Sequence, residues 1–180
     1  MFDLITYDNE GRPKISVVVE NKTPTLAVFT DQNGIPPSSD YATRDVRGIF
    51  PVLDFDNSTS ESIYFVGLMP QQYQNNGITG YVYFTSDATS GDVDWDLYFD
   101  RLTSADLDID GNSFGVAFSS DDNDVSGTTG VISIATWTLN HGVGMDNIVA
   151  GDMFVIKLTR DIGDTAAGDA NFLALELRGQ

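Results

Sequence analysis

Closely spaced aspartates are the residues of this sequence with the clearest potential for chemistry. Asp106, Asp108 and Asp110 alternate with apolar residues and are followed by Gly111. Alternating carboxylates that surround a cation, with a glycine that permits a sharp turn, open a calcium-binding loop of the EF-hand kind. The bidentate acid expected at the twelfth position falls on Ala117. The loop therefore matches the motif only at its beginning.

Two interpretations of these aspartates stay open. The one we favour is structural: the segment ends a strand, so that Leu107 and Ile109 point inward and the aspartates face water. The alternative is a calcium site assembled from two loops, the second of which would supply Asp121, Asp122 and Asp124. Apart from this calcium candidate, the sequence predicts no metal and no cofactor.

Aromatic residues next to acids raise the question of carbohydrate chemistry. Asp94 and Asp96 flank Trp95, and glycosidases pair carboxylates across a sugar. In a chain with 27 acids some pairs fall two residues apart by chance, so we interpret this pair as one polar strand face. Four tyrosines on neighbouring predicted strands could form a platform for sugar or protein, or lie in the core with wet hydroxyls: Tyr64, Tyr81, Tyr83 and Tyr98.

The motifs of enzyme active sites give no support for catalysis. His141 is the single histidine, and no Gly-x-Ser-x-Gly nucleophile elbow accompanies it. The sequence contains no Walker A loop, no dinucleotide fingerprint and no His-x-x-x-His pair. It contains no cysteine, which excludes disulfides and thiolate ligands. We expect a protein that is not an enzyme.

Charge excludes further classes of function. The 180 residues include 27 acids and 9 bases, for a net charge of −18, and such a surface repels nucleic acid. No apolar run approaches the roughly 20 residues that span a bilayer, so we expect no membrane partner. Asp3 stands where a signal peptide would carry basic residues, which predicts no secretion by that route.

Composition and periodicity together predict an all-β fold. The acids are 23 Asp and only 4 Glu, and Asp favours turns over helices. Alternation of apolar and polar residues predicts about ten strands: 15–20, 25–30, 49–55, 62–68, 78–85, 93–100, 114–119, 131–139, 154–159 and 172–177. Only 87–91 and 145–150 could hold a short helix. The spacing of the strands predicts a jelly-roll-like antiparallel β-sandwich.

The N-terminal quarter differs from the remainder in charge. Residues 1–47 hold five bases and seven acids, whereas residues 48–180 hold four bases and 20 acids. We therefore predict two parts, residues 1–47 as an N-terminal arm with a strand pair that reaches beyond the sandwich, and residues 48–180 as the sandwich itself. Ordinary edge strands of one domain are the alternative for 1–47.

Several short segments of the sequence resemble a known family of structural proteins. They are residues 47–56 (RGIFPVLDFD), residues 88–95 (ATSGDVDW), and the segments 151–154, 159–161 and 168–170. These segments resemble small jelly-roll proteins of tailed bacteriophages, over about residues 44–178. The resemblance implies a capsid decoration, or cement, protein, often a homotrimer, that binds the major capsid protein on the outer surface of the virion.

The N-terminal segment lies outside this resemblance and would carry the attachment. An extended arm can add strands to the sheet edge of another subunit. We expect its anchors to be Phe2, Leu4, Ile5 and Tyr7, together with Arg12.

Two alternatives to a decoration protein remain. One is a tail-fibre or receptor-binding module that holds a host glycan with exposed aromatics and loops such as 71–77. The other is a secreted carbohydrate-binding or glycoside-cleaving sandwich.

Overall fold

Strands make up nearly all the regular structure of the chain. The computed structural model describes residues 4–7, 13–16, 23–102, 109–111, 113–120 and 122–180. Its strands are β1 (Leu4–Tyr7), β2 (Pro13–Ser16), β3 (Thr25–Thr30), β4 (Thr43–Arg47), β5 (Phe50–Phe55), β6 (Ser62–Leu68), β7 (Ile78–Ser86), β8 (Asp94–Leu102), β9 (Phe118–Ser120), β10 (Ser133–Leu139), β11 (Met153–Asp161) and β12 (Ala170–Gly179). Two 3₁₀ turns, η1 (Asp31–Asn33) and η2 (Val143–Met145), are its described helical segments.

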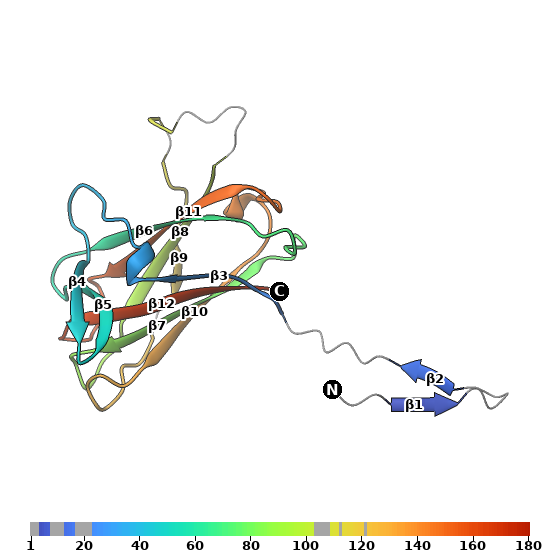
Figure 1. The fold of residues 1–180 in the computed structure, drawn as a ribbon. Coiled ribbons are helices and arrows are strands. Elements are labelled where there is room, and N and C mark those ends of the chain that lie inside the picture. Colours follow the sequence, from blue (N-terminus) through green and yellow to red (C-terminus); the bar gives the residue numbers. More distant parts are fainter. Residues whose placement is uncertain (1–3, 8–12, 17–22, 103–108, 112, 121) are drawn as a thin grey trace.

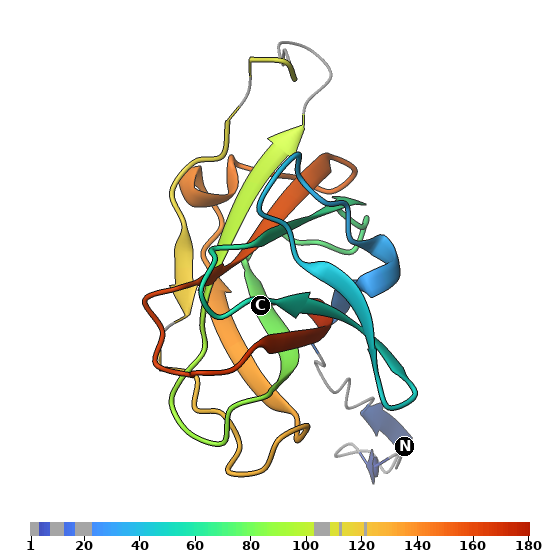
Figure 2. The same cartoon turned by 90° about the vertical axis from the view of Figure 1, so that its left-hand side faces the viewer.

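The strands form two main sheets that pack face to face (Figures 1 and 2). One sheet has the order β10-β7-β12-β5-β4, with β3 also paired to β12, and the other has the order β6-β11-β8-β9. The paired strands of both sheets are antiparallel. The prediction of an all-β, jelly-roll-like antiparallel sandwich is confirmed.

Alternation along the strands sends aromatic side chains into the space between the sheets. In β8, Trp95 and Leu97 have no exposed surface, whereas Asp94 and Asp96 on either side of Trp95 are partly exposed. The Trp95 ring lies edge-on to two rings of the opposite sheet, 5.0 Å from Phe55 and 5.6 Å from Phe84 between centroids. Such edge-to-face pairs add to the stabilisation that burial itself supplies. The core therefore joins the two sheets through aromatic contacts.

Most of the predicted strands agree with the structure, although β1 and β4 were not predicted and a few strand ends differ. The predicted segments 25–30 and 62–68 coincide with β3 and β6, and 131–139 contains β10. The segment 114–119 is strand only from residue 118 onward, and residues 87–91 form bends, not a helix. Residues 17–20 of the first predicted strand lie outside the described residues.

Two strands of the N-terminal quarter belong to the sandwich. β3 pairs with β12 and β4 pairs with β5, all within the six-stranded sheet. β3 and β4 are therefore strands of the sandwich itself, and the division of the chain at residue 47 stays a prediction. β1 and β2 pair with each other in a separate two-stranded sheet (Figure 1).

Candidate functional site

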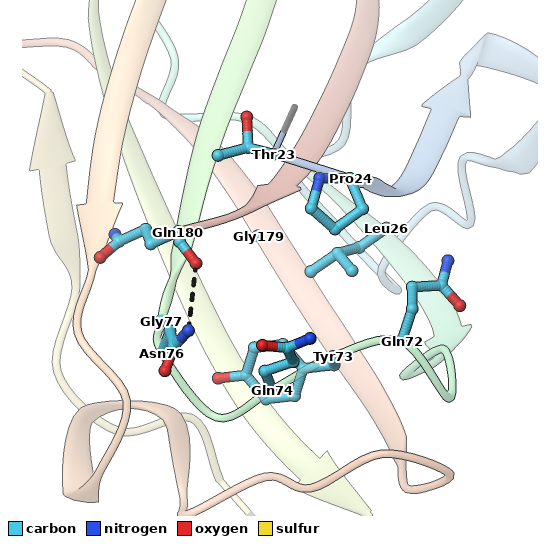
Figure 3. Close-up of a pocket in the computed structure, with 10 residues that line it drawn as sticks. All are labelled: Thr23, Pro24, Leu26, Gln72, Tyr73, Gln74, Asn76, Gly77, Gly179 and Gln180. Atoms are coloured by element: carbon cyan, nitrogen blue, oxygen red, sulfur yellow. Dashed lines mark hydrogen bonds between the residues drawn. The ribbon is translucent and has the colours of Figure 1, made fainter. Parts of the chain in front are cut away.

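One pocket of the described chain lies where three distant segments meet. The loop before β7, the start of β3 and the end of β12 enclose about 360 Å³ (Figure 3). We call it the amide pocket, and its lining residues are Thr23, Pro24, Leu26, Gln72, Tyr73, Gln74, Asn76, Gly77, Gly179 and Gln180. A concave site of several hundred Å³ is the size that small ligands use.

Backbone contacts fix the walls of the amide pocket. Gln180 donates from its backbone N–H to the Gly77 carbonyl at 3.2 Å, and Gly179 donates to the Pro24 carbonyl at 2.9 Å. The Gln180 side chain donates to the Ile78 carbonyl at 3.0 Å. Gly77 has a φ of +101°, and a Cβ there would lie 2.6 Å from the Leu139 carbonyl oxygen. The turn that shapes the pocket thus requires glycine at this position.

Four side-chain amides give the amide pocket its chemical character. Asn76 donates to the backbone carbonyl of Gln180 at 3.4 Å, whereas Gln72 and Gln74 are exposed and hydrogen-bond to no residue that the structure describes. An amide offers two donors and an acceptor in one plane. The described lining contains no acidic side chain, no basic residue and no histidine. This surface is suited to a neutral ligand with many hydroxyl groups.

Tyr73 closes the floor of the amide pocket and connects it to His141. The Tyr73 hydroxyl lies 3.1 Å from Nδ1 of His141. Burial raises the pKa of the Tyr73 hydroxyl above its usual value, so the hydroxyl stays neutral at physiological pH. His141 therefore has a structural partner in Tyr73. Among the described residues, no serine hydroxyl is hydrogen-bonded to His141 as a catalytic triad would require.

The four tyrosines considered as a platform fall into two groups on opposite sheets. Tyr64 and Tyr98 flank Lys157 in the outer face of the β6-β11-β8 sheet, and the Phe114 ring lies 5.6 Å and 6.1 Å from theirs. The Lys157 ammonium lies 3.8 Å from the centre of the Tyr98 ring. A sugar that stacked on this ring would have to displace the cation.

Tyr81 and Tyr83 lie on β7, in the other sheet. The Arg178 guanidinium stacks over the Tyr81 ring at 4.5 Å, and Tyr83 donates to Glu176 at 3.2 Å. The partners of these rings come from β12 of the same sheet. The tyrosines therefore form two separate structural clusters and not one shared platform.

The acid pair beside Trp95 does not form a sugar-binding face. Trp95 is fully buried in the core, so it cannot stack on a ligand. Asp94 accepts a hydrogen bond from the backbone of Asp122, and Asp96 accepts one from the Ser119 hydroxyl. Both carboxylates thus hold neighbouring backbone and strand β9 in place.

The calcium candidate is only partly within the described residues. Asp106, Asp108 and Asp121 lie outside them, and Asp110 occupies a turn. Within the part of the chain that the structure describes, no group of three acids or histidines could hold a metal ion. Asp124 instead shares a hydrogen bond with Asp92, which raises the pKa of Asp124.

The predicted arm anchors are described only in part. Phe2 and Arg12 lie outside the described residues, whereas Leu4, Ile5 and Tyr7 are in β1. There they stand opposite Ser16, Ile15 and Pro13 of β2. The role of these residues in attachment stays a prediction.

None of the helical segments described is long and apolar enough to cross a membrane.

Comparisons with known proteins find similarity in fold. No family model matches the chain, and no curated protein sequence matches it. Among solved structures, the chain is similar to the CBM36-1 domain of a multidomain xylanase from the hindgut metagenome of Trinervitermes trinervoides, with 14% identity and a TM-score of 0.51. That match covers 86% of this chain and 97% of the other.

Two further solved structures resemble the chain more distantly. One is a carbohydrate-binding module CBM36 in complex with calcium and xylotriose, with 15% identity, a TM-score of 0.48 and coverage of 84% and 99%. The other is the K1 cleaved adhesin domain of Lys-gingipain from Porphyromonas gingivalis W83, with 13% identity, a TM-score of 0.46 and coverage of 87% and 99%. At such identities the similarity concerns the β-sandwich fold alone.

Proposed function

We propose that this chain is a non-catalytic carbohydrate-binding β-sandwich module that holds a neutral glycan in the amide pocket. The observation that carries the proposal is the presence of four side-chain amides around one concavity of about 360 Å³. Neighbouring hydroxyls of a sugar each donate and accept a hydrogen bond. A planar amide can pair with two such hydroxyls at once, because its N–H donates to one while its oxygen accepts from the other.

The remaining lining fits the less polar parts of a sugar. Pro24 and Leu26 supply apolar surface on one side, and Tyr73 supplies the edge of an aromatic ring at the floor. Sugar rings present C–H groups as well as hydroxyls, so a site of mixed apolar and amide character suits them. The described lining holds no pair of carboxylates for acid–base catalysis, and we therefore propose binding without turnover.

The similarity of fold supports the same proposal. The solved domain that resembles this chain at a TM-score of 0.51 is a carbohydrate-binding module of a xylanase. The amide pocket also contains part of the loop 71–77, which the sequence already suggested as a glycan-binding loop. Pocket chemistry and fold therefore favour the same class of ligand.

Isothermal titration with neutral xylo-, cello- and galacto-oligosaccharides tests the proposal. We expect saturable binding to at least one series, weakened about tenfold or more by Gln72→Ala combined with Gln74→Ala, because each lost amide removes one or two hydrogen bonds. Gln71→Ala is the matched control, since Gln71 is an exposed amide of the same loop outside the pocket lining. Absence of binding to all three series, or equal binding by the double variant, would overturn the proposal.

A capsid decoration protein is the second candidate function, supported by the N-terminal hairpin. β1 and β2 form a sheet of their own, and an isolated two-stranded hairpin is marginally stable in water. Pairing with a sheet edge of another protein would stabilise it. In this proposal the partners are a phage major capsid protein and further copies of the chain, arranged as a trimer on the outer surface of the virion.

Deletion of residues 1–16 separates the two candidates. If the chain decorates capsids, the deletion abolishes capsid attachment and leaves the near-ultraviolet circular dichroism of the sandwich unchanged. If the deleted protein attaches to capsids as the full chain does, the arm has no part in attachment. Glycan binding in the amide pocket should survive the deletion, because residues 1–16 are not among its described lining.

A further inference from the structure

Three polar side chains form one row across the outer face of the six-stranded sheet. Asn171 of β12 stands opposite Asp54 of β5 on one side and opposite Thr85 of β7 on the other. Their chain neighbours Leu53, Phe84 and Phe172 are buried in the core. Because side chains alternate along a strand, these three polar residues point to the other face. We call Asp54, Thr85 and Asn171 the polar row.

Each member of the polar row has a buried atom without a hydrogen-bond partner among the described residues. These atoms are Oδ1 of Asp54, Oγ1 of Thr85 and Nδ2 of Asn171. Thr85 is 5% exposed and Asn171 is 4% exposed. Buried polar groups are nearly always paired, since an unpaired one loses its hydration without compensation. Three unpaired groups side by side indicate a place where a polar group from elsewhere would be stabilised.

An apolar pocket adjoins the polar row on the same face. It encloses about 150 Å³, and Thr85 belongs to its lining together with Val52, Leu173 and Ile132. Arg47 also lines the pocket, and its guanidinium is paired with the Asp87 carboxylate. Val52 precedes Asp54 by two residues on β5, and Leu173 follows Asn171 by two residues on β12. The pocket and the row are thus one continuous surface, with an aliphatic part and a polar end.

The charges around Asp54 favour a cation at this polar end. Burial, together with the negative charges of Asp169, Asp87 and Asp45, raises the pKa of Asp54 to about 6. Arg47 opposes them, but it forms an ion pair with Asp87. A positive group placed beside Asp54 would therefore meet a field of excess negative charge.

We propose that the apolar pocket and the polar row bind the side chain of a lysine from a protein partner. The aliphatic stem would lie along Val52 and Leu173, and the ammonium would reach Asp54, Thr85 and the oxygen of the Asn171 amide, which a half-turn of the amide presents. A protein is the source we favour because two apolar residues of the lining are widely exposed, Phe50 at 62% and Ile132 at 56%. Exposed apolar surface around a central pocket is the pattern of protein docking sites.

Two peptides test this proposal on the full chain. The acetylated, amidated tripeptide leucine–lysine–leucine is titrated at pH 7.5 and followed by the amide NMR signals of Thr85, Asn171 and Leu173. The matched peptide has norleucine in place of lysine. We expect the lysine peptide to shift these signals and to bind about tenfold more tightly, because only it carries a charged donor. Equal affinities, or shifts confined to other residues, would refute the proposal.

Variants and a small probe complete the test. Asp54→Asn and Thr85→Val should each reduce the affinity for the lysine peptide, by about tenfold for Asp54→Asn. Asp124→Asn, which changes an acid of another cluster, should leave the affinity unchanged. If Asp54→Asn binds as the wild type does, the polar row does not hold the ammonium. If n-pentylamine binds while the lysine peptide does not, the site takes a free amine, and the protein partner is refuted.

Discussion

Arg160 is a charged side chain with no exposed surface, and its surroundings explain how the core tolerates it. Its guanidinium donates two hydrogen bonds to the carboxylate of Asp164, at 2.8 Å and 3.2 Å, and one each to the carbonyls of Phe55 and Ala166 at 3.1 Å. The Asp164 carboxylate is 1% exposed. A buried charge is acceptable only when it is paired and fully hydrogen-bonded. Arg160 therefore ties β11 to β5 and to the loop before β12.

Truncation of Arg160 should be among the most damaging single changes in the sandwich. We expect Arg160→Ala to lower the free energy of unfolding by about 3–5 kcal/mol, because Asp164 and two carbonyls lose their donor in the interior. Urea denaturation followed by tryptophan fluorescence measures this. Arg101→Ala is the control: Arg101 pairs with Asp152 near the surface, where an ion pair is worth about 1 kcal/mol or less. Equal losses for the two variants would contradict the prediction.

Asp54 should destabilise the folded chain at neutral pH. Its pKa is raised from 3.8 to about 6, so the folded state disfavours the ionised carboxylate. The contribution of Asp54 to stability is then largest below pH 4 and is lost as the pH rises through 6. Asp54→Asn should therefore raise stability at pH 7, by about 1 kcal/mol after allowance for partial exposure.

Denaturation of the two proteins at pH 4 and at pH 7 checks the sign of this effect. The gain from Asp54→Asn should be present at pH 7 and should nearly vanish at pH 4, where the wild-type carboxyl is protonated in the folded state. A gain that is the same at both pH values would point to packing and not to ionisation. An outright loss at pH 7 would contradict the prediction.

At the scale of the elements, glycines with positive φ mark the turns that fix the strands. Gly48 joins β4 to β5 with a φ of +64°, and a Cβ there would meet nothing within 4 Å. Gly91 lies before β8 with a φ of +91°, and a Cβ there would lie 2.6 Å from the Thr165 carbonyl oxygen. The two positions share a left-handed conformation and differ in available space.

This difference predicts unequal costs for the same substitution. Gly48→Ala should lower the free energy of unfolding by about 1 kcal/mol, because alanine is disfavoured in the left-handed backbone conformation. Gly91→Ala should cost about 3 kcal/mol or more, since it adds a clash with backbone that cannot move aside. Thermal unfolding of both variants measures the comparison. Similar losses of stability in the two variants would mean that the backbone around Thr165 shifts to make room for the added Cβ.

Some elements could be predicted from the sequence and others could not, for physical reasons. β6 was predicted because Ile63 and Phe65 are buried in the core and alternate with more exposed neighbours. β4 was missed because four of its five residues are exposed, so it carries no alternation that could reveal it.

The same reasoning applies to the candidate sites. Loop composition drew attention to residues 71–77, but the approach of Gln180 and Thr23 to this loop depends on contacts between distant segments. The polar row depends on strand register, which pairs Asp54 with Asn171. If the pairing of these strands shifted by one residue, their side chains would move to the other face of the sheet. Turn residues and alternation do not specify the register between strands that are distant in the sequence.

At the scale of the whole molecule, the net charge of −18 works against the compact state. Like charges repel more strongly when the chain is folded, because folding brings them closer together. Added salt shortens the range of this repulsion from about 30 Å at 0.01 M to about 3 Å at 1 M. We expect the melting temperature to rise by several degrees between 0.01 M and 1 M sodium chloride, measured by calorimetry. A melting temperature that falls over this range would contradict the prediction.

β12 has a consequence for the way the chain folds as it is synthesised. This strand pairs with β7, β3 and β5, so it supplies hydrogen bonds to strands from the first half of the sequence. A ribosome delivers residues 170–179 after all of these partners. Until then β3, β5 and β7 have no common neighbour to hold them in one sheet, and their edges are open to wrong pairings. The sandwich should therefore form in one late step, and nascent chains that stop before residue 170 should be bound by chaperones and sensitive to protease.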